Sequence, residues 1–185
     1  MSSINIKAAV AVVVLPSLLA GIALAAQDRY TLQVPGGLAF SEFRGYEDWQ
    51  TVAVSLNGQL IDTILGNPTM IEAYKSGIPG NGKPFHDGAK MAKIHWTAKK
   101  AEDQPGEPAV PGALHDTDFM VKDSKRFADS GGWGWGAFEY DSASATFRPA
   151  NTTDQPPQAH DAKCGFACHT VVKNRDYVFT DYGPR

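Results

Sequence analysis

The chain has 185 residues, of which 43% are hydrophobic, 20% charged and 10% aromatic, so it has enough apolar content for one globular domain with a buried core. This composition excludes a disordered tail, and the length leaves too little chain for two full domains. The formal net charge is −3 and no block of basic residues occurs, which argues against a nucleic-acid partner, because such binding depends on cations that neutralise phosphates.

The first residues have the features of a secretory signal. Lys7 is followed by an apolar run over residues 8–19, and the small residues Ala23 and Ala25 precede the expected cleavage site. We therefore expect residues 1–25 to be a signal peptide, which leaves one domain over 26–185 that is periplasmic or secreted. An uncleaved anchor is the alternative, but Pro16 and the small residues favour cleavage, so we expect no stable membrane anchor.

The first half of the domain predicts three strands and a helix. Residues 49–56 are rich in β-branched side chains, and Asn57-Gly58 predicts a hairpin turn into a second strand over 60–65. Asn67-Pro68 is typical of a helix start, which predicts a short helix over 68–76.

Residues 90–96 alternate, so they predict a third strand with two distinct faces. The alternation places Met91, Lys93 and His95 together on one face and Trp96 on the other. Lys93 is therefore either an exposed edge charge or a buried functional amine, and the pattern by itself favours exposure.

The second half is expected to begin with a solvated loop over 99–113, which carries three prolines. The elements expected after it are a strand over 116–121, a short helix over 124–128, strands over 133–140 and 146–148, a linker over 149–157, a helical segment over 159–173 and a strand over 177–180. The predicted fold class is therefore α+β and β-rich: an antiparallel sheet with a few short helices, ending in a helix and a strand.

The two cysteines of the chain lie close together, and the second is followed by a histidine: Cys164-Gly-Phe-Ala-Cys168-His169. In an exported chain this arrangement is typical of c-type haem attachment, in which two thiols form thioethers and the adjacent imidazole binds iron. The usual motif has two residues between the cysteines and this one has three, so we expect the intervening turn to bulge.

Three other hypotheses for this segment stay open. Cys164 and Cys168 can form a local disulfide in an oxidising compartment. His160, Cys164 and Cys168 are spaced four apart, so on a helix they share one stripe beside His169, which is typical of a zinc or copper site. The third is two buried thiols and a surface histidine.

Several other residues are candidates for a cofactor pocket. Trp133, Trp135 and Phe119 can wall a flat apolar ligand, although aromatic residues in strands more often form ordinary core. Asp118 is either an outward carboxylate or, if its strand faces a ligand, a proton acceptor.

Five segments of the chain resemble the cytochrome P-460 family and its relative cytochrome c′-beta. They cover residues 83–96, 118–128, 132–135, 164–169 and 176–182, and include the run Lys-Asp-Ser-Lys-Arg-Phe at 122–127. The resemblance implies a β-rich homodimer with one covalent haem c, His169 as the proximal iron ligand and an open distal side. It also implies that Lys93 is the position of an additional lysine cross-link to the porphyrin, and that Asp118 is the distal carboxylate, where hydroxylamine-oxidising members carry Glu.

Two functions follow from these expectations. The first is oxidation of hydroxylamine, or of a related small nitrogen compound such as NO, at a five-coordinate haem, with Asp118 or His95 as general base and a soluble electron acceptor. The second is a non-catalytic NO- or CO-binding or electron-transfer protein whose distal side is packed with Met91, Phe119 or Phe127. A zinc or copper site built from the Cys and His residues is the remaining alternative.

Overall fold

The computed structural model describes residues 26–35, 37–150 and 160–185, and in the last segment the side chains from Gly165 onward. The predicted signal peptide and most of the predicted linker over 149–157 lie outside the described residues. Within the described part of the chain, no helix has the length and apolar character needed to cross a membrane.

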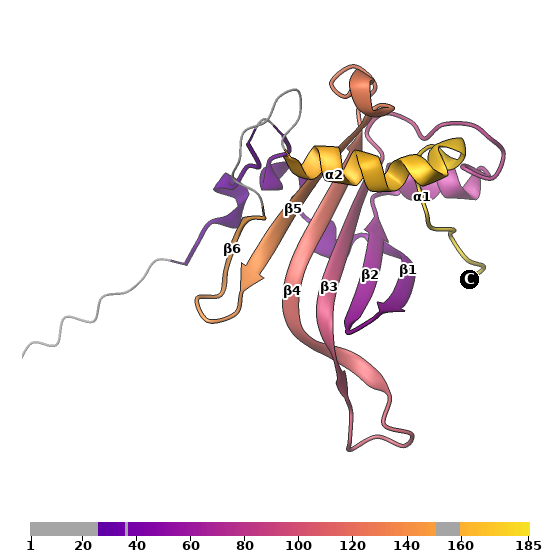
Figure 1. Ribbon diagram of the computed structural model, residues 1–185. Coiled ribbons are helices and arrows are strands. Elements are labelled where there is room, and N and C mark those ends of the chain that lie inside the picture. Colours follow the sequence, from indigo (N-terminus) through magenta and orange to yellow (C-terminus); the bar gives the residue numbers. More distant parts are fainter. Residues whose placement is uncertain (1–25, 36, 151–159) are drawn as a thin grey trace, which may run out of the picture.

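Six strands form one antiparallel sheet in which the order along the chain is also the order in space (Figure 1). Because every neighbouring pair is antiparallel, short connections suffice, and the longest one, between the second and third strands, contains a helix. The strands are β1 (Gln50–Asn57), β2 (Leu60–Gly66), β3 (Lys90–Lys100), β4 (Ala109–Lys122), β5 (Trp133–Asp141) and β6 (Thr146–Pro149).

Two α-helices flank the sheet. The helix α1 (Pro68–Lys75) begins where Asn67 Oδ1 accepts a hydrogen bond from the Met70 N–H, as the Asn-Pro pair predicts. The helix α2 (His160–His169) crosses one face of the sheet and packs mainly on β5 (Figure 1). Short 3₁₀ helices complete the fold: η1 (Arg29–Thr31), η2 (Phe40–Phe43), η3 (Tyr46–Asp48), η4 (Ala128–Ser130) and η5 (Thr170–Arg175).

Each face of the sheet has its own hydrophobic core, because alternate side chains of a strand point to opposite faces. One core lies between the sheet and the N-terminal segment, and its centre is Phe40, whose ring contacts Phe119 and Phe138. The other lies under α1, α2 and the C-terminal tail and includes Met70 and Trp135. This second face carries the candidate site.

The structure confirms the β-rich α+β class with an antiparallel sheet and a few short helices, including the predicted strands from 49–56 through 146–148 and the helix over 68–76. The loop expected over 99–113 is wrong at both ends, because β3 continues to Lys100 and β4 starts at Ala109 and pairs with it, which leaves only residues 101–108 as a loop. Pro111 is tolerated in β4 because β5 pairs only with residues 116–122 of β4. The edge of β4 that would face β5 is therefore unpaired at Pro111, and a proline N without hydrogen costs no hydrogen bond to β5 there.

Two other expected elements are corrected. The helix expected over 124–128 is a turn that leads into η4. The Asp123 carboxylate caps its start by accepting hydrogen bonds from the Lys125 and Arg126 N–H groups, but Gly131 and Gly132, both with positive φ, reverse the chain before a helix can extend. The strand expected over 177–180 joins no ladder. Its carbonyl and hydroxyl groups bind side chains instead, as Thr180 does with the Tyr74 hydroxyl.

Candidate haem site

A cavity of about 570 Å³ lies between α2, the C-terminal tail and the sheet. This volume falls in the range of about 300–1,000 Å³ that is usual for small-molecule and cofactor sites. Its lining is mostly apolar with a few polar side chains: Ser55, Asp62, Ile64, Met91, Lys93, Asp118, Phe119, Met120, Trp135, Gly136, Ala137, Gly165, Cys168, His169, Val178, Phe179 and Thr180.

His169, the last residue of α2, is held in the orientation of a metal ligand. Its Nδ1 lies 2.6 Å from the carbonyl oxygen of Tyr177. Because a carbonyl only accepts, Nδ1 carries the hydrogen and donates it, which leaves the lone pair on Nε2 free. Burial lowers the pKa of His169, and the positive charge of Lys93 lowers it further against the opposing effect of the Tyr177 bond. The neutral imidazole that iron requires is therefore the favoured form.

A buried ion pair holds the turn that presents the Tyr177 carbonyl. Asp176 and Tyr177 both have positive φ, 49° and 63°, so the chain reverses sharply here. The Asp176 carboxylate accepts hydrogen bonds from Lys122 Nζ at 2.7 and 2.9 Å and from the Phe85 N–H at 2.7 Å. Sequence reasoning missed Lys122 and Asp176 as positioning residues, although both lie in the segments that carry the family resemblance.

The cysteine spacing is accommodated without a bulge. Cys164 and Cys168 are positions i and i+4 of the uninterrupted helix α2, so their backbone positions lie one turn apart on the same face. The expected bulge is therefore wrong, because a helix brings i+4 as well as i+3 onto one face. The Cys168 thiol is free, exposed and part of the cavity wall. The side chains of Cys164 and His160 lie outside the described residues. The hypotheses that depend on them, a disulfide and a zinc or copper site, also lie outside the described part of the structure.

Close contact between α2 and β5 places His169 beside Trp135. A Cβ atom on Gly165 would lie 2.4 Å from Trp135 Cγ, so only glycine allows the helix this close. The Trp135 and His169 rings are 5.5 Å apart. The buried Trp135 Nε1 donates no hydrogen bond within the described structure, and a cofactor that carries carboxylates, as haem does, can satisfy it. Apolar walls, an oriented imidazole and an unsatisfied donor all fit haem.

Three aromatic residues are predicted to wall the cofactor pocket: Trp133, Trp135 and Phe119. Of these, only Trp135 both lines the cavity and belongs to the core on this face of the sheet. Trp133 is fully buried, lies outside the lining and packs edge-on against Phe85 at 5.9 Å. Phe119 borders the cavity, but its ring stacks on Phe43 at 4.2 Å in the core on the opposite face, and Phe127 belongs to that core too. Strand alternation explains the error, because Phe119 follows Asp118 directly and must point the other way.

The polar part of the wall comes from three neighbouring strands. Lys93 and Asp118 are register partners on β3 and β4, and both line the cavity. Lys93 Nζ lies 3.1 Å from Asp62 Oδ2 on β2, and its side chain is 36% exposed, so it is neither a free surface charge nor fully buried. Sequence reasoning missed Asp62, which is 2% exposed; the available signal was a carboxylate between apolar residues in a strand.

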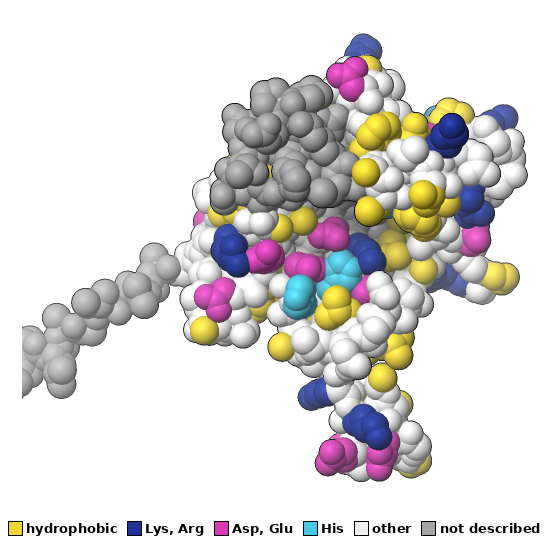
Figure 2. Space-filling model, in the orientation of Figure 1, with side chains coloured by type: hydrophobic (Ala, Val, Ile, Leu, Met, Phe, Trp, Pro, Cys, Tyr) yellow, Lys and Arg dark blue, Asp and Glu magenta, His cyan; other side chains and the backbone are white. Residues whose placement is uncertain are grey.

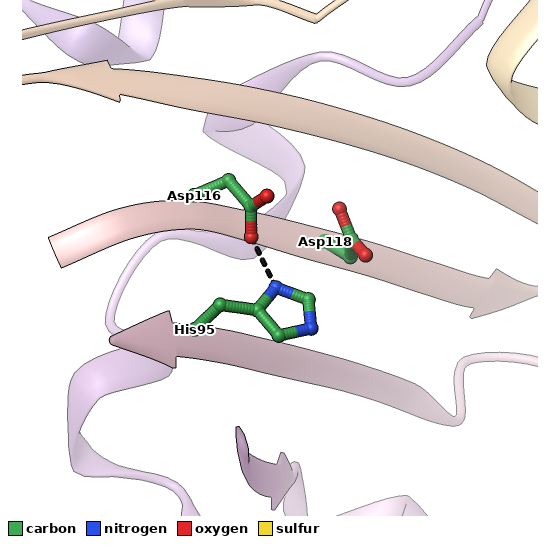
Figure 3. Close-up of side chains that lie close together, drawn as sticks. All are labelled: His95, Asp116 and Asp118. Carbon is green, nitrogen blue, oxygen red and sulfur yellow. Dashed lines mark hydrogen bonds and ion pairs between the residues drawn. The ribbon is translucent and has the colours of Figure 1, made fainter. Parts of the chain in front are cut away.

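His95 lies behind this wall and is not part of the described lining. Its Nδ1 is hydrogen-bonded to Asp116, and its Nε2 is 3.5 Å from Asp62 Oδ1 (Figure 3). Burial opposes the charged form, but the bond to Asp116 and the charges of Asp116 and Asp118 outweigh it, so the pKa of His95 is raised. Burial also disfavours the ionised form of Asp116, but the hydrogen bonds and charges of His95 and His115 outweigh this effect and lower the pKa of Asp116.

Figure 2 shows histidine and acidic side chains gathered on this face.

A β-rich antiparallel domain whose C-terminal Cys-Cys-His helix closes an apolar cavity has the site of a c-type haem protein. Residues 43–180, most of the chain, match the family described as cytochrome P460. The chain belongs to this family, which confirms the resemblance seen in its sequence and identifies it as a haem-binding cytochrome of the c type. No curated protein matches the sequence.

Proposed function

We propose that this chain is an exported haem enzyme that oxidises hydroxylamine, or a related small nitrogen compound such as NO, in the cavity beneath α2. The observation that carries the proposal is the pairing of an oriented, neutral His169 with a carboxylate, Asp118, in the wall of the same cavity. Iron needs the first, and removal of substrate protons needs the second.

The residues of α2 would hold the cofactor. Each thiol of Cys164 and Cys168 would add its sulfur and hydrogen across one vinyl group of haem, a reaction that needs no external oxidant. His169 Nε2 would bind the iron. When bound, the haem supplies an iron centre that accepts electrons from the substrate and passes them to a soluble acceptor.

The strands would supply the proton chemistry. Asp118 would act as the general base, because its carboxylate lines the cavity and is only partly buried, whereas the Asp62 residue is 2% exposed. Lys93 lies in the same wall, at the position where the resemblance implies a cross-link. His95, predicted as a second base, lies behind Asp62 and would act only through its neighbours.

The test is hydroxylamine-dependent reduction of an acceptor dye by the purified, haem-loaded protein. We expect Asp118→Asn to lower kcat by about 10²–10⁴-fold, the usual contribution of a general base. The matched control is Asp103→Asn, on an exposed loop residue. A wild-type protein with an ordinary c-type spectrum and no such activity would remove the enzymatic proposal.

Mass spectrometry of the intact holoprotein and its tryptic peptides tests the attachment. We expect the peptide that contains Cys164 and Cys168 to carry the mass of haem, and the same peptide map tests the link at Lys93. Haem that is lost on acid-acetone extraction would contradict covalent attachment.

Binding of NO or CO without turnover is the second candidate function. The apolar lining favours it, because Ile64, Met91 and Met120 offer no hydrogen bonds to a polar substrate. The Phe119 and Phe127 rings do not crowd this side, since they lie in the other core. A spectral change on titration with NO, together with no dye reduction by hydroxylamine, would favour this function.

Export and assembly belong to the same proposal. The sequence of residues 1–25 supports export to the periplasm. The exposed apolar side chains of Val54 and Leu56 on the edge strand β1 support a homodimer. Light scattering of the purified protein tests the dimer, and amino-terminal sequencing of the exported protein tests cleavage after Ala25.

A further inference from the structure

We propose that His95, Asp116 and Asp118 form a binding site for a divalent transition-metal cation such as Zn²⁺, separate from the haem iron. One ligand atom from each residue lies within 4.8 Å of the other two. Figure 3 shows the three side chains pointing toward one another from two adjacent strands.

Strand pairing brings these side chains together. His95 on β3 and Asp116 on β4 are register partners, so their side chains leave the sheet on the same face. Asp118 lies two residues further along β4 and therefore points the same way. The register of β3 and β4 shifts just beyond His95, and next to that shift His115 Nδ1 lies 2.8 Å from the second oxygen of Asp116. A further nitrogen ligand is thus close by.

Asp62 has the position of the outer carboxylate that supports a metal-bound histidine. Its Oδ1 is buried, accepts no hydrogen bond within the described structure, and lies 3.5 Å from His95 Nε2. Histidines that bind metals usually donate their other ring N–H to such an oxygen, which fixes the tautomer. In the metal-free protein, Nδ1 shares a hydrogen with the Asp116 carboxylate. A cation that displaces this hydrogen would bind the lone pair of Nδ1 together with the oxygens of Asp116 and Asp118, while Nε2 keeps its hydrogen and faces Asp62.

The charges and ligand types favour the same class of ion. Asp62, Asp116 and Asp118 bring three carboxylates to one region, and the described ion pair of Lys93 with Asp62 offsets one of them. One imidazole nitrogen with two carboxylate oxygens is a ligand set that Zn²⁺ accepts, with water or His115 as the fourth ligand. Mg²⁺ and Ca²⁺ prefer oxygen ligands alone, so the histidine disfavours them.

Metal binding would have a consequence for the proposed enzyme, and this step rests on the proposed function. Asp118 also lines the haem cavity. A cation bound to its carboxylate would compete with its use as a base. We therefore expect Zn²⁺ to inhibit hydroxylamine oxidation, with a concentration dependence that matches its binding.

The experiment is a titration of the haem-loaded, tag-free protein with Zn²⁺ by isothermal calorimetry, repeated with Co²⁺ to follow the visible d–d bands. We expect one saturable site per chain, lost in His95→Gln and in Asp118→Asn. Asp62→Asn should weaken binding by about 10–100-fold, the usual effect of losing an outer-shell partner. His86→Gln and Asp103→Asn remove an exposed histidine and an exposed carboxylate elsewhere and should bind like wild type.

These readouts do not depend on catalysis, so the metal site and the proposed enzyme activity fail separately. Should His95→Gln fold poorly, Asp116→Asn provides an independent loss of one ligand, and circular dichroism checks its fold. Absence of saturable Zn²⁺ binding to wild type would overturn the proposal. So would wild-type affinity in Asp118→Asn and Asp116→Asn, because the metal would then lie elsewhere.

Discussion

At the residue scale, the orientation of His169 depends on an ion pair that does not touch it. Lys122 is 6% exposed and donates to Asp176 and to the Gly131 carbonyl. Asp176 in turn holds the turn whose next residue, Tyr177, accepts from His169 Nδ1. Two charges are thus buried in order to position one backbone carbonyl.

Removal of one member of this pair should be costly. We expect Lys122→Met to lower the free energy of unfolding by about 3–5 kcal/mol, because it leaves the Asp176 charge buried without its partner. Urea unfolding measures the change. The control is Lys100→Met, which breaks an exposed ion pair with Glu107 and should cost less than about 1 kcal/mol. Equal losses in the two variants would contradict this role of Lys122.

The Lys122→Met variant should also disturb the haem iron. Since the turn at Asp176 carries the carbonyl that orients His169, its loosening should shift the Soret band of the holoprotein. The control variant Lys100→Met should keep the wild-type spectrum. An unchanged spectrum in Lys122→Met would show that the carbonyl of Tyr177 keeps its place without the ion pair.

Tyr74 should make stability depend on alkaline pH. Burial raises its pKa from 10 to about 12, and its hydroxyl is bonded to Thr180 in the cavity-lining tail. The unfolded chain then loses this proton first, so the stabilisation is complete below pH 10 and is lost as the pH rises through 12. We expect a loss of about 1 kcal/mol between pH 10 and 11 by urea unfolding. Tyr74→Phe should remove this part of the loss and Tyr140→Phe should not.

At the scale of elements, the crossing of α2 over β5 decides where the segment over residues 164–169, the proposed haem-attachment segment, lies. Gly165 is the contact point, and Trp135 beneath it is held in the core of the sheet. A glycine inside a helix lowers helix stability by about 1 kcal/mol relative to alanine. Gly165 therefore weakens α2 slightly but allows it to lie close to β5.

Gly165→Ala tests that balance. The helix propensity of alanine favours the variant by about 1 kcal/mol. The clash with the Trp135 ring costs about 1–3 kcal/mol, because a buried ring has no room to move. We expect a net loss of stability and a reduced haem content by the pyridine haemochrome assay. Ala167→Gly, at an exposed position of the same helix, should cost about 1 kcal/mol without loss of haem. Full haem loading in Gly165→Ala would contradict the tight crossing.

At the scale of the whole molecule, the sheet separates two cores that depend on the cofactor to different extents. The core around Phe40 is packed by the chain's own aromatic rings. The other face contains the cavity of about 570 Å³. Its apolar walls are exposed to water unless a ligand fills the cavity.

The cofactor-free protein should therefore lose order on one side only. We expect a Cys164→Ala/Cys168→Ala variant, made without haem, to melt less cooperatively than the holoprotein by circular dichroism. Hydrogen exchange should show fast amides in α2 and protected amides in β4 and β5. Native-like melting together with protection of α2 would contradict the dependence on haem.

Local signals in the sequence predicted much of the fold. Alternation in residues 90–96 and the Asn57-Gly58 turn predicted strands that the structure confirms, because burial of one sheet face imposes a period of two. Local signals failed for residues 109–113, where pairing with β3 overrides the loop signal of Pro111 and Gly112, and for 177–180, where side chains rather than a strand satisfy the backbone.

The sequence by itself determined the family and predicted the haem-attachment segment, because the Cys-Cys-His spacing and the runs around it are contiguous along the chain. Only the tertiary structure decided which side chains line the cavity and hold the turn that orients His169. Asp62 and Lys122 are far from His169 in sequence, and Asp176 acts on it through the turn that follows α2, so their roles come from strand register and from a turn with positive φ. Such contacts between distant segments follow from how the sheet and helix pack, which no local pattern records.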